Sequence, residues 1–267
     1  MKEDNFLLGQ IEDKLSQCDN KYIVTGTGFL DAHQQSLCRE YCRKQHVPIF
    51  DEETEYAALR SGTLPMIRTR FYGGYSGAER VIMINLPDYA VLQEQNPLVI
   101  IRAEKAAGAK ELTHRDYLGS LIGLGIKREM IGDILVRGDG ADIIVLAEIA
   151  DYILLHYGKA GRVSLTLSSH SIEELILPQT ERKVVTDTVA SLRLDNVIAS
   201  AFGLSRGKAA EAIGRGIVFV NHVEVTKADF QLKEGDKLTL RGKGKACLSE
   251  IGGKSRKDRQ YITLEKY

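Results

Sequence analysis

The chain has 267 residues, a length that suggests about two domains or three small ones. Hydrophobic residues make up 43% and charged residues 27%, which excludes disordered, collagen-like and coiled-coil proteins. Basic and acidic residues number 36 each, so the net charge by itself argues against a nucleic-acid partner.

The charge is nevertheless distributed unevenly along the chain. Residues 186–267 contain 15 basic and 10 acidic side chains, whereas residues 1–185 contain 21 and 26. Within the basic part, residues 241–259 carry seven basic side chains against two acidic ones. A basic end on an acidic protein is typical of a tethered polyanion-binding module, although a solvated lysine-rich tail gives the same count.

The spacing of the cysteines and the lack of a long apolar segment predict the cellular compartment. None of the four cysteines lies in a Cys-x-x-Cys pair, so the sequence indicates no disulfide framework. The most apolar stretch, residues 143–155, contains Glu148 and Asp151, and no basic segment followed by an apolar run begins the chain. We therefore expect no signal peptide, no membrane span and a cytoplasmic location.

Residues 1–78 predict a mixed α/β domain. Phe6, Leu7, Ile11 and Leu15 recur at helical spacing. A second helix is expected over residues 31–44, capped by Asp31, and a third begins near Asp51. The glycine-rich residues 71–77 are expected to form a loop.

Residues 79–170 predict a ferredoxin-like domain. A strand over 80–86 comes first, and from Leu98 onward the order is β-α-β-β-α-β, with a hairpin turn at residues 138–140. RNA-recognition domains share this topology, but they stack bases on aromatic side chains of the central strands. The expected central strands carry only aliphatic side chains around Ile100 and Ile144, so the fold is expected without that mechanism.

Residues 171–185 read as a linker and residues 186–267 as a third domain. Two helices are expected over 192–202 and 206–213, and short strands follow, the last at 237–240, before a basic tail. The predicted fold class is therefore α+β in three small domains.

Spaced motifs in this third domain carry a resemblance. They are residues 191–195 (SLRLD), 204–206 (LSR), 216–221 (GIVFVN), 235–236 (GD) and 241–244 (RGKG). Their order resembles the αL motif, the RNA-binding domain shared with small-subunit ribosomal protein S-four. The resemblance implies two short helices that pack on a small sheet and present basic residues to structured RNA.

The local chemistry agrees with RNA binding. The expected helix start at Ser205 offers backbone N–H groups to a phosphate, and nearby cations would neutralise further phosphates. The simpler alternative is that Arg193 and Asp195 form only a helix-terminal ion pair. The predicted RNA-binding residues are Arg193, Ser205, Arg206, Lys208, Arg215, Arg241, Lys243 and Lys245.

Four longer segments extend the resemblance over most of the chain. Residues 71–80, 112–121, 124–134 and 188–195 are similar to the YlmH family of bacterial RNA-binding proteins. That resemblance implies a factor of ribosome-associated quality control. Its implied partners are large ribosomal subunit RNA, peptidyl-tRNA and other quality-control factors, and it supports template-free C-terminal tailing of stalled nascent chains.

A second charged surface is expected around the helix that starts at residue 114. Its candidate RNA contacts are His114, Arg115, Lys127 and Arg128, although helix-end charges are often merely solvated. Residues 114–116 read His-Arg-Asp, as in a kinase catalytic loop, but position 121 is Leu where a kinase has Asn. A kinase is therefore excluded, and a capped helix start is the better interpretation.

Two further patterns are weak signals for a metal or a nucleotide. Cys38, Cys42 and His46 are four residues apart, and His33 lies nearby, but an amphipathic helix that buries two cysteines explains the spacing better. Residues 26–28 (GTG) lack the third glycine or the lysine of a nucleotide loop and are expected to form a turn. We expect no metal and no cofactor.

An enzyme is the alternative to a binding protein. Residues 193–195 mimic the Arg-Leu-Asp motif of pseudouridine synthases, yet here they open the RNA-binding motif itself. We expect a non-catalytic protein, while an RNA-modifying enzyme of the synthase or methyltransferase type with catalytic residues in 1–170 stays open. A deep cleft with ionisable groups of strongly shifted pKa in that part of the chain would favour the enzyme.

Overall fold

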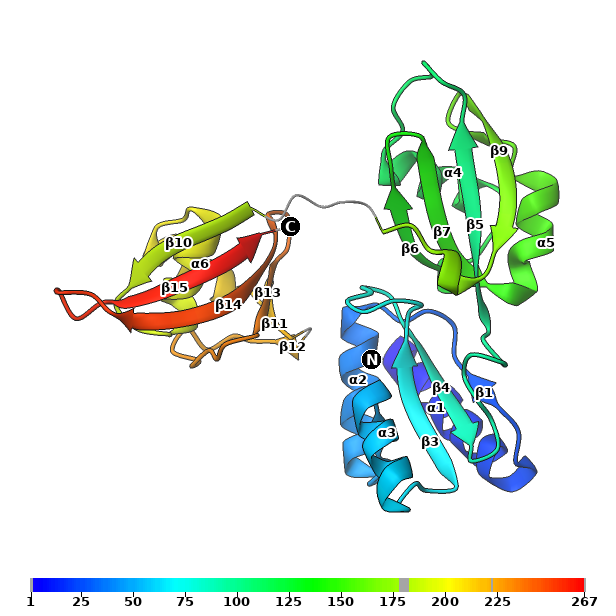
Figure 1. Cartoon of the computed structure of the whole chain (residues 1–267), viewed down its shortest axis with the longest axis horizontal. Coiled ribbons are helices and arrows are strands. Elements are labelled where there is room, and N and C mark those ends of the chain that lie inside the picture. Colours follow the sequence, from blue (N-terminus) through cyan, green and yellow to red (C-terminus); the bar gives the residue numbers. More distant parts are fainter. Residues whose placement is uncertain (1, 178–182, 222, 267) are drawn as a thin grey trace. The chain divides into compact units, whose positions relative to one another are not determined.

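The computed structural model describes residues 2–177, 183–221 and 223–266 and divides the chain into two compact units, Met1–Pro178 and Gln179–Tyr267 (Figure 1). The division falls inside the predicted linker, of which residues 178–182 lie outside the described part. The linker was predicted too long at both ends. Ile172 packs into the core of the first unit, and residues 183–185 already belong to a strand.

The N-terminal part of the first unit is a four-stranded sheet with three helices. In the sheet, β2 pairs with β3 in parallel and the other neighbours are antiparallel, in the order β1-β4-β3-β2. Asp31 caps α2 as expected, and Asp51, near the predicted start of the third helix, caps α3, because each carboxylate accepts the backbone N–H three residues later. The elements are α1 (Lys2–Lys21), β1 (Thr25–Gly26), α2 (Ala32–Lys44), β2 (Ile49–Phe50), α3 (Glu52–Ser61), β3 (Ile67–Tyr72) and β4 (Ile82–Pro87).

The strand that we expected to open the middle domain belongs to this first sheet. It is β4, which pairs with β3 from Tyr72↔Ile82 to Ile67↔Pro87. All six of its residues are buried. Met83 packs against the helices of the N-terminal part, whereas Ile82 and Ile84 share a core with Ile100 and Ile144 of the middle sheet. The predicted limit after residue 78 therefore falls in the connection between two paired strands, because the glycine-rich loop that suggested a boundary is the turn between them.

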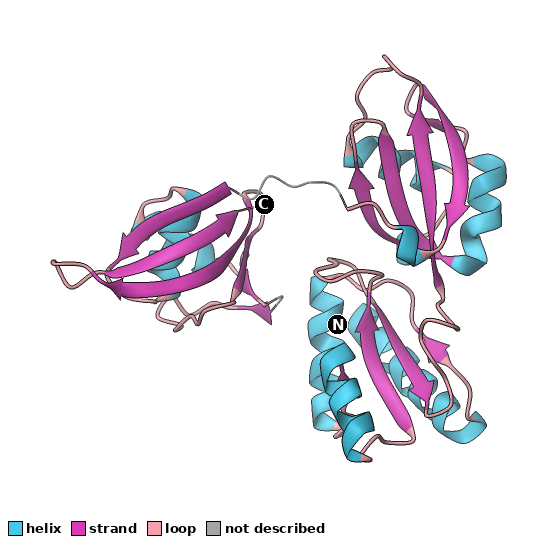
Figure 2. Ribbon diagram, in the orientation of Figure 1, coloured by secondary structure: helices cyan, strands magenta, loops and turns pink. Residues whose placement is uncertain are grey.

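The middle part has the expected ferredoxin-like topology (Figures 1 and 2). Its antiparallel sheet has the order β6-β7-β5-β9-β8, and α4 and α5 cover one face, where Tyr117, Leu121 and Ile153 pack against the sheet. The elements are β5 (Leu98–Lys105), α4 (His114–Gly123), η1 (Arg128–Met130), β6 (Ile131–Val136), β7 (Gly140–Leu146), α5 (Ala147–His156), β8 (Lys159–Ala160), β9 (Val163–His170) and η2 (Ile172–Glu174).

A buried carboxylate ties these two parts of the first unit together. Asp133 on β6 accepts hydrogen bonds from the Tyr75 hydroxyl at 2.8 Å and from the backbone N–H groups of Glu79 at 2.7 Å and Arg80 at 3.0 Å. The Arg80 guanidinium donates to the carbonyls of Ile131 and Phe29. The loop before β4 is thereby fixed to the middle sheet.

The turn at residues 26–28 is part of the same contact. A Cβ added to Gly28 would lie 2.9 Å from the carbonyl oxygen of Glu129, so the close approach of the two parts requires glycine there. The sequence predicted the turn but not this packing role.

The C-terminal unit packs two helices on a six-stranded sheet with the order β10-β15-β14-β13-β11-β12. The two helices and the strand at 237–240 are close to their predicted positions. The elements are β10 (Lys183–Val189), α6 (Leu194–Phe202), α7 (Arg206–Gly214), β11 (Val218–Val220), β12 (Val223–Glu224), β13 (Lys237–Leu240), β14 (Gly244–Lys254) and β15 (Gln260–Lys266).

The predicted basic tail is wrong, because residues 244–266 form a β-hairpin inside this sheet. Ala246 and Leu248 on β14 and Ile262 and Leu264 on β15 alternate with polar residues and are almost fully buried. This period of two places one face of the hairpin in the core. The basic side chains between them made the segment look like a solvated tail.

Replacement of Asp133 tests the connection between the two parts of the first unit. We expect Asp133→Asn to lower the free energy of unfolding by about 2–4 kcal/mol, because an amide nitrogen would face three buried donors. Tyr75→Phe removes one of those donors and should cost about 1 kcal/mol. Urea unfolding followed by circular dichroism measures both.

Asp139→Asn is the matched control, since the side chain of Asp139 on the same domain is 70% exposed. If Asp133→Asn unfolds at the same urea concentration as this control, the carboxylate does not hold the two parts together.

Candidate nucleic-acid interface

One buried carboxylate organises the starts of both helices in the C-terminal unit. Asp195, in the first turn of α6, is 3% exposed. It accepts hydrogen bonds from Nε and a terminal nitrogen of Arg193, both at 3.1 Å, and from Nε of Arg206 at 3.0 Å. Burial opposes ionisation of this carboxyl, but the bonds from Arg193 and then Arg206 outweigh burial and hold its pKa below the ordinary value.

The contact explains why Arg193 and Asp195 are close in sequence. They do form the helix-terminal ion pair that the sequence suggested as a simpler alternative, and the same carboxylate also fixes Arg206, eleven residues further on. The Arg206 side chain is still 58% exposed. Its guanidinium is therefore oriented at the start of α7 and accessible to a ligand.

The start of α7 has the expected cap. The hydroxyl of Ser205 accepts the backbone N–H of Lys208 at 3.3 Å. The N–H groups at the beginning of a helix point outward and favour an anion such as a phosphate. Arg206 and Lys208 flank this position, and both are exposed.

Four of the predicted cations line one open pocket of about 250 Å³, which we call the basic groove. Arg241 lies over the ring of Phe219, with the guanidinium carbon 4.8 Å from the ring centre. Phe219 was not predicted, although its place in an alternating strand was the available signal. The groove is lined by Leu204, Lys208, Glu211, Ala212, Arg215, Ile217, Leu240, Arg241 and Lys243.

The groove is also lined by one acidic side chain, Glu211. A nitrogen of Arg215 lies 3.9 Å from its carboxylate, and both side chains are 68% exposed. Such a pair contributes little to stability in water and can separate when a phosphate binds. Arg193 and Lys245 do not line the groove, so the structure brings four predicted cations together there and places Arg206 beside them.

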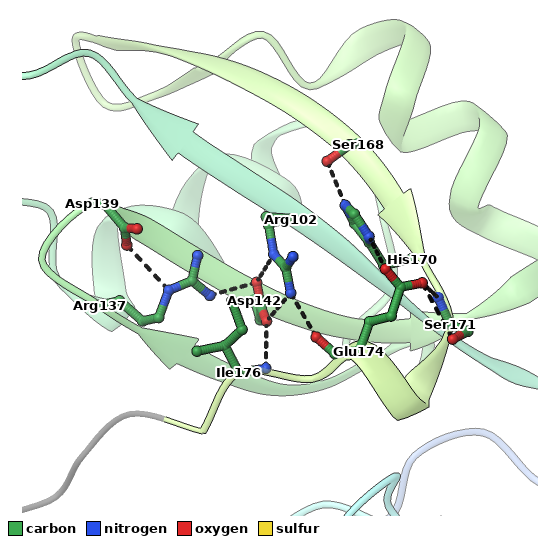
Figure 3. Close-up of polar contacts among 9 residues, drawn as sticks. All are labelled: Arg102, Arg137, Asp139, Asp142, Ser168, His170, Ser171, Glu174 and Ile176. Atoms are coloured by element: carbon green, nitrogen blue, oxygen red, sulfur yellow. Dashed lines mark hydrogen bonds and ion pairs between the residues drawn. The ribbon is translucent and has the colours of Figure 1, made fainter.

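The open face of the middle sheet differs from that of an RNA-recognition domain (Figure 3). Asp142, fully buried, accepts two hydrogen bonds from Arg102, at 2.9 and 3.0 Å, and pairs with Arg137. The backbone N–H of Ile176 also donates to this carboxylate. Burial opposes ionisation of Asp142, but these partners keep its pKa below the usual range.

A row of hydrogen bonds lies beside this pair on the same face. Ser168 Oγ is 2.8 Å from Nε2 of His170, whose Nδ1 is 2.9 Å from a carboxylate oxygen of Glu174 (Figure 3). Hydrolases use these residue types in this order. Here Glu174 also accepts from Ser171 at the start of η2, so the row holds the segment after β9 against the sheet.

The second charged surface is only partly as predicted. His114, Arg115 and Lys127 are exposed, and Asp116 accepts the backbone N–H and the hydroxyl of Thr113, which makes the expected capped helix start. Arg128 is different, because its guanidinium donates to the carbonyls of Ile131 and Gly132. Arg128 is half-buried, and burial and then the charge of Arg80 lower its pKa to about 10. Its guanidinium is therefore engaged within the unit rather than fully exposed to a partner.

The cysteines of α2 have a packing role. Cys38 and Cys42 are buried against Leu7 and Ile11 of α1, and burial raises their pKa values to about 12 and about 11. The helix ends at Lys44, so His46 does not share their face. His33 is exposed beside Asp4.

Within residues 2–177, 183–221 and 223–266, no three His, Cys, Asp or Glu side chains lie as a metal ion would require. In the same part of the chain, every helix is too short or too polar to cross a bilayer.

Two family models, one relative and one solved structure are similar to parts of this chain. Residues 97–174 match the family model described as "Putative RNA-binding domain in YlmH", and residues 192–238 match the S4 domain. The ribosome-associated protein quality control protein P2 of Bacillus subtilis (strain 168) is 35% identical over 197 residues, which are 73% of this chain and 77% of that protein. A solved structure, the cell division protein ylmH from Streptococcus pneumoniae, covers 66% of this chain and is itself covered to 96%, with 21% identity and a TM-score of 0.48.

Fold and matches together define a protein with two RNA-binding domains, a ferredoxin-like one and an S4 domain. The chain belongs to the YlmH family. The family and the fold class that the sequence motifs predicted are thereby confirmed.

Replacement of Asp195 tests whether it organises this site. We expect Asp195→Asn to lower the free energy of unfolding of the C-terminal unit by about 1–3 kcal/mol at neutral pH, because two guanidinium groups lose a buried acceptor. A carboxyl whose pKa is lowered on folding stabilises the protein above its unfolded pKa, near ~4, and this stabilisation is lost as the pH falls through the lowered value. Thermal unfolding of the unaltered chain and of Asp195→Asn measures this. The difference between their unfolding temperatures should be smaller at acidic than at neutral pH.

Asp258→Asn serves as control, since the side chain of Asp258 in the same unit is 81% exposed. Equal stability of the two variants at neutral pH would contradict the organising role of Asp195.

Proposed function

We propose that this protein is a non-catalytic RNA-binding factor of ribosome-associated quality control, which binds the large ribosomal subunit beside peptidyl-tRNA in the cytoplasm. In this role it supports template-free C-terminal tailing of stalled nascent chains. Its partners are large-subunit RNA, peptidyl-tRNA and other quality-control factors.

The basic groove is the observation that carries the proposal. Lys208, Arg215, Arg241 and Lys243 line one surface, and the start of α7 lies beside it. Cations that converge on an open groove, together with outward N–H groups, suit the phosphates of a structured RNA. Such contacts read the shape and charge of the backbone more than its sequence.

The ribosomal partner rests on the relative. The protein of Bacillus subtilis is named as a ribosome-associated quality control protein, and the similarity spans most of both chains. A second RNA-binding domain in residues 97–174 supports a large RNA partner, because two modules on one chain bind more tightly than either alone.

The interior of the first unit supports a non-catalytic role. Its groups with strongly shifted pKa values, such as Tyr75, Arg128 and Cys38, have packing roles and structural hydrogen bonds. One open pocket in this unit has a volume of about 350 Å³. Of the residues that line it, Glu129 alone is ionisable, and the others are apolar residues, glutamines, a threonine and a glycine. General acid–base catalysis usually needs a pair of such groups.

The salt dependence of RNA binding tests the groove. We expect Lys208→Ala combined with Lys243→Ala to weaken binding to purified large-subunit ribosomal RNA and to reduce the slope of log K against log salt by about two, because two phosphate contacts are lost. Filter binding between about 0.05 and 0.2 M salt measures the slope.

Lys227→Ala combined with Lys233→Ala removes the same charge from exposed positions of the same unit that do not line the groove. If both double variants reduce the slope equally, the effect is one of net charge and the groove is not the binding surface.

A further inference from the structure

A second pocket in the C-terminal unit lies between the end of β10 and α6. It has a volume of about 450 Å³ and is lined by residues 187–190 of the β10 side, by residues of α6 and by Arg206 and Arg259. Leu204 lines both this pocket, which we call the β10 pocket, and the basic groove. The two surfaces therefore adjoin at the start of α7.

Both arginines of the β10 pocket are held in place from one side. Arg206 donates through Nε to Asp195 at 3.0 Å. Arg259 donates through Nε to the hydroxyl of Thr188 at 3.1 Å and through a terminal nitrogen to the carbonyl of Thr188. A guanidinium has five N–H donors, so each arginine keeps donors for an anion while its orientation is already fixed.

The pocket walls combine polar and apolar surface. Asp187 accepts from Ser200 at 2.6 Å, and Asn196 donates through its amide nitrogen to Ser191, which leaves its amide oxygen as an acceptor. Ala199 and Leu204 supply the apolar wall, and Val189 lies behind it in the core. The volume falls within the range of about 300–1,000 Å³ that is usual for small organic ligands. An anion at the arginines, a hydroxylated sugar and a flat base would match these three kinds of surface.

Half of this pocket comes from elements outside the matched S4 residues. That match covers residues 192–238, whereas β10 and Arg259 lie before and after it. They are brought together because β10 pairs with β15 along its whole length, from Lys183↔Lys266 to Val189↔Gln260 (Figure 1). The pocket is thus built by the extra strands of this chain.

We propose that the β10 pocket receives one unstacked nucleotide of the bound RNA, with its phosphate between Arg206 and Arg259 and its base against Ala199 and Leu204. The Asp187 carboxylate and the Asn196 amide oxygen accept from the 2′-hydroxyl or a base amino group, which favours RNA over DNA. The inference rests on the proposed RNA-binding function and deepens it. The protein would then bind a loop or an end of the RNA in addition to any duplex.

Crosslinking of the full-length protein tests the pocket directly. The probe is large-subunit ribosomal RNA transcribed with 4-thiouridine, irradiated in the complex, and the labelled peptides are identified by mass spectrometry. We expect labelled nucleotides on residues 187–190 and 199–206. Crosslinks confined to the basic groove would overturn the inference and leave the proposed function intact, whereas absence of RNA binding would overturn both.

Matched variants separate a pocket contact from general charge. Arg259→Ala should weaken binding of this RNA about tenfold or more and remove the crosslinks in the pocket. Arg256→Ala, in the same exposed turn but outside the pocket, should weaken binding only about twofold. Equal losses in the two variants would overturn the inference.

Two controls keep the test decisive. Arg259→Lys retains the charge but not the two-sided donor geometry, so it should bind RNA more weakly than the unaltered chain if its circular dichroism is unchanged. Free 4-thiouridine monophosphate is irradiated in place of RNA. Labelling of the pocket by the free nucleotide, with RNA crosslinking only elsewhere, would identify a mononucleotide site and contradict the proposal.

Discussion

The C-terminal unit depends on one buried carboxylate. Asp195 has two arginine partners, Arg193 and Arg206, and a buried charge without such partners would be very costly. Because the partners come from the starts of two different helices, the same contact that satisfies Asp195 also fixes α6 and α7 relative to each other. The function proposed for the unit then follows from packing, since Arg206 is already oriented before an RNA arrives.

This pre-organisation distinguishes the arginines from the lysines of the site. Lys208 and Lys243 are long, exposed and flexible, and they contribute mainly charge and salt dependence. Arg206 and Arg259 are anchored through one side of the guanidinium and Arg241 lies on an aromatic ring, so little freedom is lost when they bind. The site thus combines oriented arginines with exposed lysines.

The first unit does not use the RNA-recognition mode that its middle sheet suggests. Its middle sheet has the topology of an RNA-recognition domain, but the face opposite α4 and α5 is partly covered by residues of the same unit. Ile100 and Ile144 pack against the N-terminal part, and Asp142 is closed off by Arg102 and the segment that follows η2. The central strands β5 and β7 carry no aromatic side chain, so this face lacks the platform that base stacking requires. His114, Arg115 and Lys127, which are exposed, are the residues of this unit that we still predict to contact RNA.

The sequence predicted those features that local spacing determines. The βαββαβ order, the helix starts near Asp31, Asp51 and Ser205, and the cation set around α7 all depend on residues near one another in the chain. The errors concern long-range pairing. The membership of β4 in the first sheet depends on its pairing with β3 across the glycine-rich loop, which no local pattern specifies. Arg128 is a different case, because its guanidinium donates to carbonyls only three and four residues further on.

The hairpin β14–β15 is an instructive case. Its buried alternation was visible in the sequence, but the lysines and arginines, most of which lie in the turns at 241–243 and 255–259, suggested a tail. As a consequence Arg259 was counted as part of a charged run and not as a candidate site residue. Only the pairing of β15 with β10 places it beside Arg206.

Sedimentation of a cell lysate tests the central claim most directly. The protein is followed by immunoblot through density gradients at low and moderate salt. The account predicts that it migrates with free large ribosomal subunits and peptidyl-tRNA at low salt and dissociates as salt rises, because phosphate contacts supply most of the affinity. Migration at the top of the gradient at every salt concentration would contradict it.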